Sequence, residues 1–237
     1  MTRRSYNQYC GLASALDIVG ERWSLLVVRE LMSGPKRYSD LAAALVGIGT
    51  SMLASRMRYL EADGIVARRH LPPPAASLVY ELTPAGRELA EAMTPLAMWG
   101  VRHRLGTPRL PEQALRAEWS LVFLAEMMDR DALAGVRATI EFRVDESIAQ
   151  MRLADGQVEV RPGAAIGEAD AVVTTDVVTL AAIGAARLSA VDAIAAERVV
   201  LAGDPSVLQV LLAALPSALV YGEAGGDGSA AAPEGEQ

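Results

Sequence analysis

The sequence predicts an α+β fold in two domains, and three observations support this prediction. Apolar residues recur at helical spacing through most of the first hundred residues, with room for one pair of strands. From residue 136 the pattern changes to alternation of apolar and polar residues, which is typical of a one-sided sheet. The charge also changes: residues 1–105 carry 13 basic and 9 acidic side chains (+4), whereas residues 106–237 carry 9 and 20 (−11). Both parts have the size of an ordinary domain.

The composition indicates a globular protein and excludes several kinds of site. Hydrophobic residues make up 51% of the chain and charged residues 22%, so a disordered chain is excluded. A single cysteine, Cys10, excludes an intrachain disulfide and a cysteine-cluster metal site. Two histidines are too few for a histidine-rich catalytic zinc site, and we expect neither a metal nor a cofactor.

Neither a membrane span nor a signal peptide is expected. The longest uncharged run, residues 205–222, contains polar residues and a proline, so we interpret it as a buried helix. The charges of Asp17, Glu21 and Arg22 interrupt any signal-peptide core near the N-terminus, and we therefore expect a cytoplasmic protein.

The basic half begins with four predicted helices. Apolar spacing indicates helices over residues 12–19 and 23–32, which end at a glycine and at Ser-Gly-Pro. Ser39 is expected to cap a short helix over residues 40–45. A glycine-bearing turn then leads to a longer helix over residues 51–62.

This longer helix has two different faces. Thr50 is expected to cap it, and the glycine after residue 63 is expected to end it. Leu53, Met57 and Leu60 fall at helical spacing and form the buried stripe. The opposite face is small and polar with one cation, and consists of Ser51, Ala54, Ser55 and Arg58. Such a face suits a major groove about 12 Å wide, although a solvated helix face would have the same pattern.

A hairpin and a final helix complete the basic half. Residues 65–71 and 78–82 are strand-like and flank a proline-rich turn, which indicates a β-hairpin. Thr83 caps the next helix, with Pro84 at its first position. The order of these elements is that of a winged helix-turn-helix, with residues 51–62 as recognition helix and residues 66–82 as wing.

At this point residues 9–105 resemble the HxlR-type winged-helix transcriptional regulators. The resemblance depends on linked G-x-x-W and R-x-x-x-L-E-x-D-G blocks. It is carried by Tyr9-Cys10, by ALDIVGERWSLL at 15–26, by RYSDL at 37–41, by MLASRMRYLEADG at 52–64 and by YELTPAG at 80–86. Members usually have a serine after an isoleucine where this chain has Gly49-Thr50-Ser51, so base contacts cannot be transferred.

The resemblance implies binding of double-stranded DNA and a homodimer formed by the first and last helices of this domain. It would place Leu12, Leu16, Pro95, Met98 and Trp99 near the partner subunit. In some members a cysteine near the N-terminus senses oxidants. For Cys10 we favour a half-buried structural cysteine, with a thiol activated by Arg3 and Arg4 as the alternative.

Ten residues are candidate DNA contacts. They are Arg37, Ser39, Thr50, Ser51, Ala54, Ser55, Arg56, Arg58, Arg68 and Arg69. Arg37, Arg56 and the wing pair would contact phosphates, since guanidinium groups position a protein on DNA without reading its sequence. The alternative is intramolecular pairing, for example of Arg56 with Glu61 or Asp63. No neighbouring acid obviously neutralises the wing pair.

The acidic half reads as one α+β layer after a linker at residues 106–112. The predicted helices cover residues 112–128, 177–186, 190–196 and 204–215, and the predicted strands cover 136–144, 149–153, 157–161 and 171–175. Asp155-Gly156 between two alternating runs is a strong hairpin signal. We therefore expect an antiparallel meander followed by helices rich in small residues over residues 113–221. Residues 222–237 are acidic and small, and predict a disordered tail.

Residues 113–216 resemble the sterol carrier protein family through the segments 169–176, 189–194 and 199–205. That resemblance implies a sheet and helices that enclose an apolar tunnel. The candidate ligand-binding residues are Trp119, Phe123, Met127, Ile140, Phe142, Met151, Leu153 and Val158. The alternative is that these side chains form an ordinary solid core.

The sequence favours a dimeric, ligand-responsive transcriptional regulator with an apolar small-molecule effector. A carrier or sequestering protein, dimerised through its winged helix, is the alternative. An enzyme is not supported, because the chain has neither a G-x-S-x-G nor a Walker motif.

Overall fold

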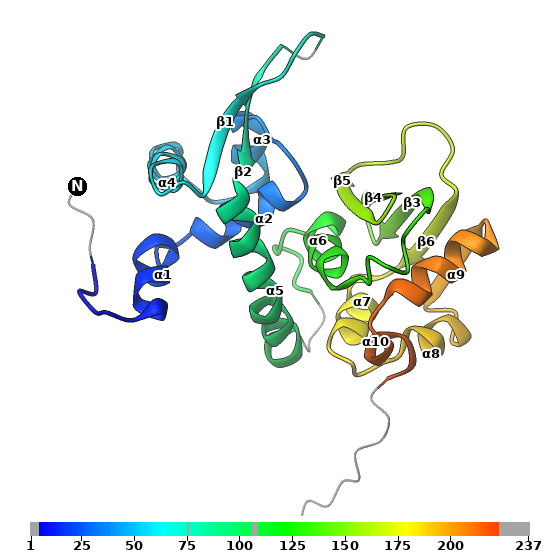
Figure 1. Ribbon diagram of the computed structural model, residues 1–237. Helices are drawn as coiled ribbons and strands as arrows, with labels where there is room; N and C mark the ends of the chain where they lie inside the picture. Colours follow the sequence, from blue (N-terminus) through cyan, green and yellow to red (C-terminus); the bar gives the residue numbers. More distant parts are fainter. Residues whose placement is uncertain (1–4, 75, 106–108, 223–237) are drawn as a thin grey trace, which may run out of the picture.

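The computed structural model describes residues 5–74, 76–105 and 109–222 (Figure 1). Residues 223–237 of the expected tail, residues 106–108 of the expected linker, and Arg3 and Arg4 lie outside these ranges. The fold is mixed α+β, with a helical winged domain followed by a domain built on a sheet. In the described part of the chain no helix is both long and apolar enough to span a bilayer.

The first domain is the winged helix-turn-helix that the sequence predicts. Its elements are α1 (Gly11–Val19), α2 (Ser24–Met32), α3 (Tyr38–Ala44), α4 (Thr50–Ala62), β1 (Val66–His70), β2 (Leu78–Leu82) and α5 (Pro84–Arg104). Strands β1 and β2 pair antiparallel and form the wing, with Arg68 opposite Tyr80. The Thr83 hydroxyl accepts the Gly86 N–H and caps α5, as expected from the Thr-Pro pair.

Two helix starts differ from the expected ones. Helix α3 begins at Tyr38, and the Asp40 carboxylate accepts the N–H of Arg37 at 3.1 Å, so Arg37 and not Ser39 is the N-cap. Helix α4 begins at Thr50 itself, because the preceding Gly49 has extended backbone and is the N-cap. Helix α3 thus starts two residues before the predicted position, where the Asp40 carboxylate satisfies the N–H of the residue preceding the helix. Helix α4 starts one residue before the predicted position, directly after the glycine.

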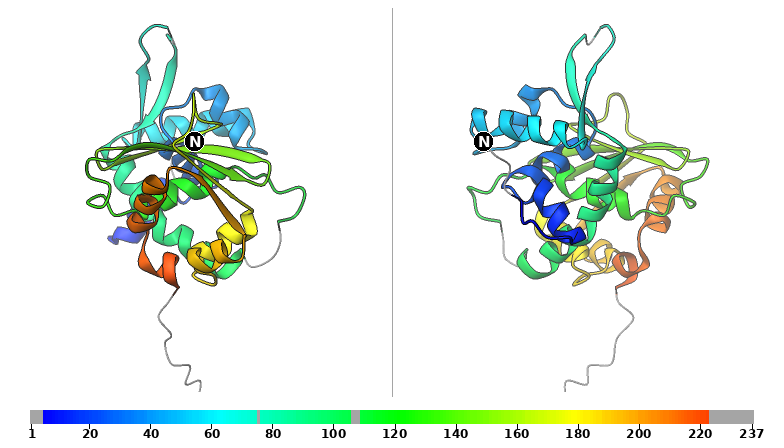
Figure 2. Two further views of the ribbon diagram at one scale, coloured as in Figure 1. Left: turned by 90° about the vertical axis from the view of Figure 1, so that its right-hand side faces the viewer. Right: turned by 60° about the vertical axis from the view of Figure 1, so that its left-hand side comes forward.

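The second domain contains a five-stranded sheet with five helices. Its elements are α6 (Ala117–Met127), β3 (Arg137–Val144), β4 (Ser147–Ala154), β5 (Gln157–Pro162), β6 (Ala171–Thr175), α7 (Val177–Gly184), α8 (Ala190–Ala195), β7 (Val199–Gly203), α9 (Pro205–Ala214) and α10 (Ser217–Tyr221). The predicted hairpin at Asp155-Gly156 joins β4 and β5. The left view of Figure 2 shows α7–α10 gathered on one side of the sheet.

The sheet is mixed and not the antiparallel meander that the sequence predicts. Its strand order is β5-β4-β3-β6-β7, and β6 lies parallel to β3 after a crossover from β5. Strand β7 was not expected, because its apolar run is only three residues long and ends in Ala-Gly at the edge of the sheet. This topology divides the covered face in two: α6 packs on β3, β4 and β5, whereas α9 packs on β6 and β7.

Candidate nucleic-acid interface and interdomain cavity

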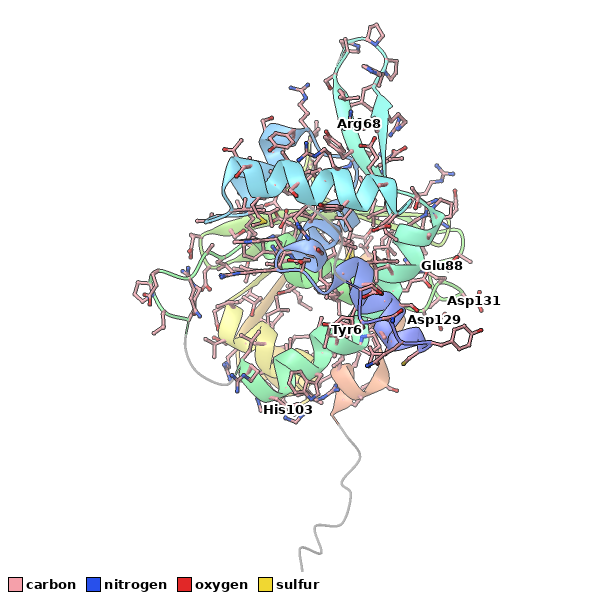
Figure 3. All side chains as sticks on the ribbon, turned by 90° about the vertical axis from the view of Figure 1, so that its left-hand side faces the viewer. Tyr6, Arg68, Glu88, His103, Asp129 and Asp131 are labelled. Carbon is pink, nitrogen blue, oxygen red and sulfur yellow. The ribbon has the colours of Figure 1, made fainter. Side chains whose placement is uncertain are left out.

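The recognition helix α4 buries its expected stripe and exposes its polar face. Leu53, Met57 and Leu60 are fully buried in the core of the winged domain. On the other face Thr50, Ser51 and Arg58 are exposed, and Ala54 and Ser55 are half-buried. Figure 1 shows α4 on the side of the winged domain away from the sheet and the wing projecting from the same domain, and Figure 3 shows Arg68 on the wing. A helix and a hairpin in this arrangement can enter a groove and lie beside it, respectively.

The two arginines of α4 differ in their surroundings. Arg58 is exposed and forms no ion pair with any described residue. The side chain of Arg56 is only 11% exposed: it lies 3.8 Å from Glu21 and stacks over the Tyr59 ring at 5.1 Å. The structure therefore contradicts a phosphate contact of Arg56. Its side chain is largely buried and lies beside Glu21, in the connection between α1 and α2. The pairing alternative holds, with Glu21 and not Glu61 or Asp63 as the partner.

At the start of α3 the two remaining candidates lie on the surface. Arg37 and Ser39 are both exposed. The Ser39 hydroxyl donates a hydrogen bond to Asp40 at 3.2 Å. Both side chains therefore remain available to a phosphate beside α4.

The wing arginines are paired, contrary to the expectation that no acid neutralises them. Arg68 bonds Glu61 of α4 at 2.9 Å and Arg69 bonds Glu81 of β2 at 2.8 Å. Their side chains are nevertheless 44% and 46% exposed. Exposed pairs of this kind contribute only about 0–1 kcal/mol, so a phosphate can compete for either guanidinium.

A buried carboxylate joins the two domains, and sequence reasoning missed it. Glu30 of α2 is fully buried and accepts hydrogen bonds from Lys36 Nζ at 2.9 Å and from Arg29 at 2.7 Å. It also accepts the indole N–H of Trp119, on α6, at 2.7 Å, while the Arg29 guanidinium lies 4.0 Å over the same ring. Burial alone would raise the pKa of Glu30, but Lys36 and Arg29 hold it below its ordinary value. The only sequence signal was the pair Arg29-Glu30 on an otherwise apolar helix, with Lys36 shortly after its end.

From this carboxylate the contacts continue to the wing. The backbone N–H and C=O of Lys36 bond the C=O and N–H of Tyr80 in β2, at 3.0 and 2.8 Å. Lys36 thus binds Glu30 with its side chain and the wing with its backbone. A series of hydrogen bonds of 2.7–3.0 Å therefore connects Trp119 to the wing through Glu30 and Lys36.

A cavity of about 710 Å³ lies between the domains. Its walls come from the C-terminal half of α5, from α6 and α7, and from the β6–β7 side of the sheet. Four of the predicted ligand-binding residues line it: Trp119, Phe123, Met127 and Phe142. Small-molecule sites typically have volumes of about 300–1,000 Å³, so the cavity is large enough for one.

The other four predicted ligand-binding residues do not line the cavity. Ile140, Met151 and Leu153 are fully buried, and Val158 packs against the same core. These side chains lie on the half of the sheet that α6 covers, and α6 fills the space there. The prediction was wrong for them because it assumed one ligand face across the entire sheet.

Exposed apolar residues mark the surface expected to meet a partner subunit. Leu12 is 69% exposed and Trp99 53%, and Leu16 and Pro95 are also exposed. Met98 is half-buried and lines the cavity instead. Leu96, on the same part of α5, is exposed as well and had not been expected.

Cys10 is exposed, so the half-buried cysteine favoured from the sequence is wrong. It is the N-cap of α1. The backbone N–H groups of Ala13 and Leu12, at the start of α1, lower the pKa of its thiol below the ordinary value. These are two properties that a reactive thiol needs.

Two family models match this chain. Residues 18–106 match the HxlR-like helix-turn-helix, and residues 113–218 match the alkyl sulfatase C-terminal domain. The second match replaces the narrower resemblance to sterol carrier proteins that the sequence suggested from short segments.

Transcriptional regulators of Bacillus subtilis match the winged domain. The chain is 34% identical over 85 residues to the uncharacterized HTH-type transcriptional regulator YvaP of Bacillus subtilis, which is 36% of this chain and 79% of that protein. It is also 34% identical over 88 residues to the HTH-type transcriptional regulator YodB of Bacillus subtilis, covering 37% and 79%. The solved structure of reduced YodB from B. subtilis has 32% identity and a TM-score of 0.37, and covers 41% of this chain and 96% of that chain. On the family-model match and the two sequence relatives, the chain belongs to the HxlR-like helix-turn-helix family of transcriptional regulators.

Proposed function

We propose that the protein is a dimeric, cytoplasmic transcriptional regulator that binds operator DNA through its winged helix and a small apolar effector in the interdomain cavity. The observation that carries the proposal is the position of Trp119. Its side chain lines the cavity and donates a hydrogen bond to Glu30 of the winged domain. In this proposal the protein has no catalytic activity.

Occupation of the cavity would affect DNA binding through this tryptophan. A ligand that shifts α6 changes the hydrogen bond to Glu30, and Glu30 holds the lysine whose backbone bonds the wing. A ligand can shift such an equilibrium only by its difference in affinity for the two states. DNA must change the ligand affinity by the same factor, because coupling between two binding sites is reciprocal.

The dimer of this proposal uses the exposed apolar residues of α1 and α5. Leu12, Leu16 and Trp99 would be covered by the second copy. A two-fold dimer presents two recognition helices to half-sites about 34 Å apart on the duplex. The acidic second domain would lie away from the DNA, since like charges repel.

Fluorescence anisotropy with the promoter region of its own gene tests the proposal. We expect specific binding that weakens steeply with salt and changes when an apolar compound raises the melting temperature of the protein. Absence of salt-dependent binding, with ligand binding intact, would favour the alternative of an apolar-ligand carrier. The size and the apolar lining of the cavity support this alternative.

A second input is proposed at Cys10, on the observation that its thiol is exposed and its pKa lowered. Dilute diamide or peroxide should change DNA binding of the wild-type protein, and Cys10→Ser should not respond. An equal response in the variant would exclude this thiol as the sensor.

A further inference from the structure

The C-terminal end of α5 is capped by a side chain of the second domain. The last carbonyl groups of a helix have no partner within the helix and need another donor. Arg187, which follows α7, donates hydrogen bonds to the backbone C=O of Arg102 at 3.2 Å and of Leu105 at 2.7 Å. Leu105 is the C-cap of α5. A guanidinium in this place also interacts favourably with the negative end of the helix dipole, so the second domain stabilises the last turn of α5.

A left-handed turn after α7 presents Arg187 to α5. The preceding residue, Ala186, has a φ of +56°, a conformation in which glycine is usual. Backbone hydrogen bonds hold this turn: the N–H of Ala186 bonds the C=O of Ile183 at 2.8 Å, and the N–H of Arg187 bonds the C=O of Ala182 at 2.9 Å. The backbone of Arg187 is thereby tied to α7, so its guanidinium moves with that helix.

Helices α7 and α5 also approach each other closely just before this turn. A Cβ atom added at Gly184 would meet Cγ1 of Val101 at 3.5 Å, which is an ordinary contact distance. Both helices are walls of the interdomain cavity, and Gly184, Val101 and Arg187 all line it. A change in the separation of the two helices therefore changes the contact of Arg187 with the end of α5.

Exposed residues of the same two turns belong to the surface expected to meet a partner subunit. Trp99 is 53% exposed, and its ring lies 5.3 Å from that of His103, one turn further along α5. Figure 3 shows His103 at this end of the helix. If the last turn of α5 loses its order, the ring contact between Trp99 and His103 is lost with it. The cap provided by the second domain thus acts on a surface of the winged domain.

We propose that Arg187 is a positioning residue that sets the strength of the subunit interface on α5. While it bonds Arg102 and Leu105, the last turns of α5 are ordered and the dimer is tight. When α7 moves away from α5, the cap is lost and the dimer weakens. This inference rests on the proposed function, to which the dimer belongs. It adds a route from the cavity that ends at the partner subunit, whereas the route through Trp119 and Glu30 ends at the wing.

Two measurements on the full chain test the inference. Hydrogen exchange followed by mass spectrometry reports the order of residues 101–105, and sedimentation velocity over a dilution series reports the dissociation constant of the dimer. In Arg187→Ala we expect exchange in this segment to be about three- to tenfold faster, because two charge-assisted hydrogen bonds are lost. The dissociation constant should rise by about the same factor. Arg187→Lys should keep part of both, since an ammonium group can still donate to one carbonyl.

Two further variants make the test specific. Arg152→Ala is the matched control, because Arg152 is an exposed arginine of the same domain that lies on β4 and outside the cavity lining. Gly184→Leu leaves Arg187 in place, but its side chain should force α7 away from Val101 and weaken the dimer as Arg187→Ala does. The two changes should not add, since both act on one contact. The route would be overturned by an equal loss in the control, by a Gly184→Leu protein that dimerises like the wild type, or by an undiminished effect of Gly184→Leu in the Arg187→Ala background.

The same data separate this inference from the proposed function. A wild-type protein that stays monomeric at every concentration would contradict the dimer of the proposed function. A dimer whose dissociation constant is unchanged in Arg187→Ala, although exchange is faster, would overturn the inference alone, because the cap would then serve only α5. Unchanged exchange in this variant would show that Arg187 does not cap α5 in solution, and would overturn the inference as well.

Discussion

Arg58 and Arg56 lie two positions apart on α4, and their environments decide what each can do. Arg58 is exposed, whereas Arg56 packs over Tyr59 beside Glu21. From sequence both are cations on a helix expected to meet DNA. The side of the helix could be predicted for Arg58 because it lies opposite Leu53, Met57 and Leu60. The partner of Arg56 could not, since Glu21 lies in the connection between α1 and α2, far from Arg56 in sequence.

Arg58→Ala should therefore weaken operator binding without destabilising the fold, because an exposed side chain without a partner is removed. A base or phosphate contact of this kind contributes about 1–3 kcal/mol. Anisotropy with operator DNA measures the loss, and Arg152→Ala, an exposed arginine of β4, is the control. If both variants bind alike, α4 does not use this face.

Glu30 is a residue whose removal should affect the entire molecule. Glu30→Gln leaves Lys36 and Arg29 without their counter-charge in a buried place, which costs about 3–5 kcal/mol. Urea unfolding measures this loss, with the exposed Glu88→Gln as control. A loss no larger than that of the control would show that the buried pairs contribute little.

The pH dependence of stability follows from the lowered pKa of Glu30. A carboxylate with a lowered folded pKa stabilises the protein above its unfolded pKa, about 4.3, and this contribution disappears as the pH falls through the folded value. The wild-type protein should thus lose stability below about pH 4.3 more steeply than Glu30→Gln. Parallel curves of unfolding free energy against pH would contradict this.

At the scale of elements, the winged domain could be predicted almost completely and the second domain only in part. Helical spacing, the Thr83-Pro84 pair and Gly64 place the helices and the hairpin within a few residues. The parallel pairing of β3 with β6 could not be predicted, because alternation reports which face is buried and not which strand is the neighbour. The cavity depends on that pairing, since β6 and β7 form part of its wall.

The wing offers a prediction at this scale. Arg68→Ala combined with Arg69→Ala should weaken binding to all DNA sequences, because phosphate contacts carry no sequence information. The slope of log affinity against log salt should flatten by about 0.9 for each lost contact. Glu81→Gln, which frees Arg69 from its pair, is the opposite control and should leave the slope as steep as before. An unchanged slope in the double variant would show that these two arginines do not contact the DNA phosphates.

At the scale of the whole molecule, the cavity and the solid core lie on the same face of one sheet and predict opposite responses to added volume. Phe142 lines the cavity, whereas Ile140, two residues earlier on β3, is fully buried in the core under α6. Sequence alone grouped the two residues, because both point to the same side of β3. The two residues differ in what covers them: α6 packs over Ile140, whereas the cavity lies beside Phe142.

Phe142→Trp should fill the cavity and remove ligand binding while the protein keeps its stability and its DNA affinity. Ile140→Phe should overpack the core and destabilise by about 1–3 kcal/mol. Melting temperatures with and without an apolar compound that binds the wild type, at one hundred times its dissociation constant, distinguish the two, since ligand should add about 2.7 kcal/mol to the wild type. Similar destabilisation by both variants would mean that Phe142 is core.

Helix α5 serves both domains, and this has a consequence for evolution and engineering. Its N-terminal half packs against α2 and β2, and its C-terminal half forms a wall of the cavity beside α6 and α7. A fragment that ends after α5 would expose Ala97, Met98 and Val101 to water and leave Glu30 without Trp119. The winged domain therefore depends on the second domain to cover part of its surface. A fusion that exchanges the second domain must provide a matching surface for α5.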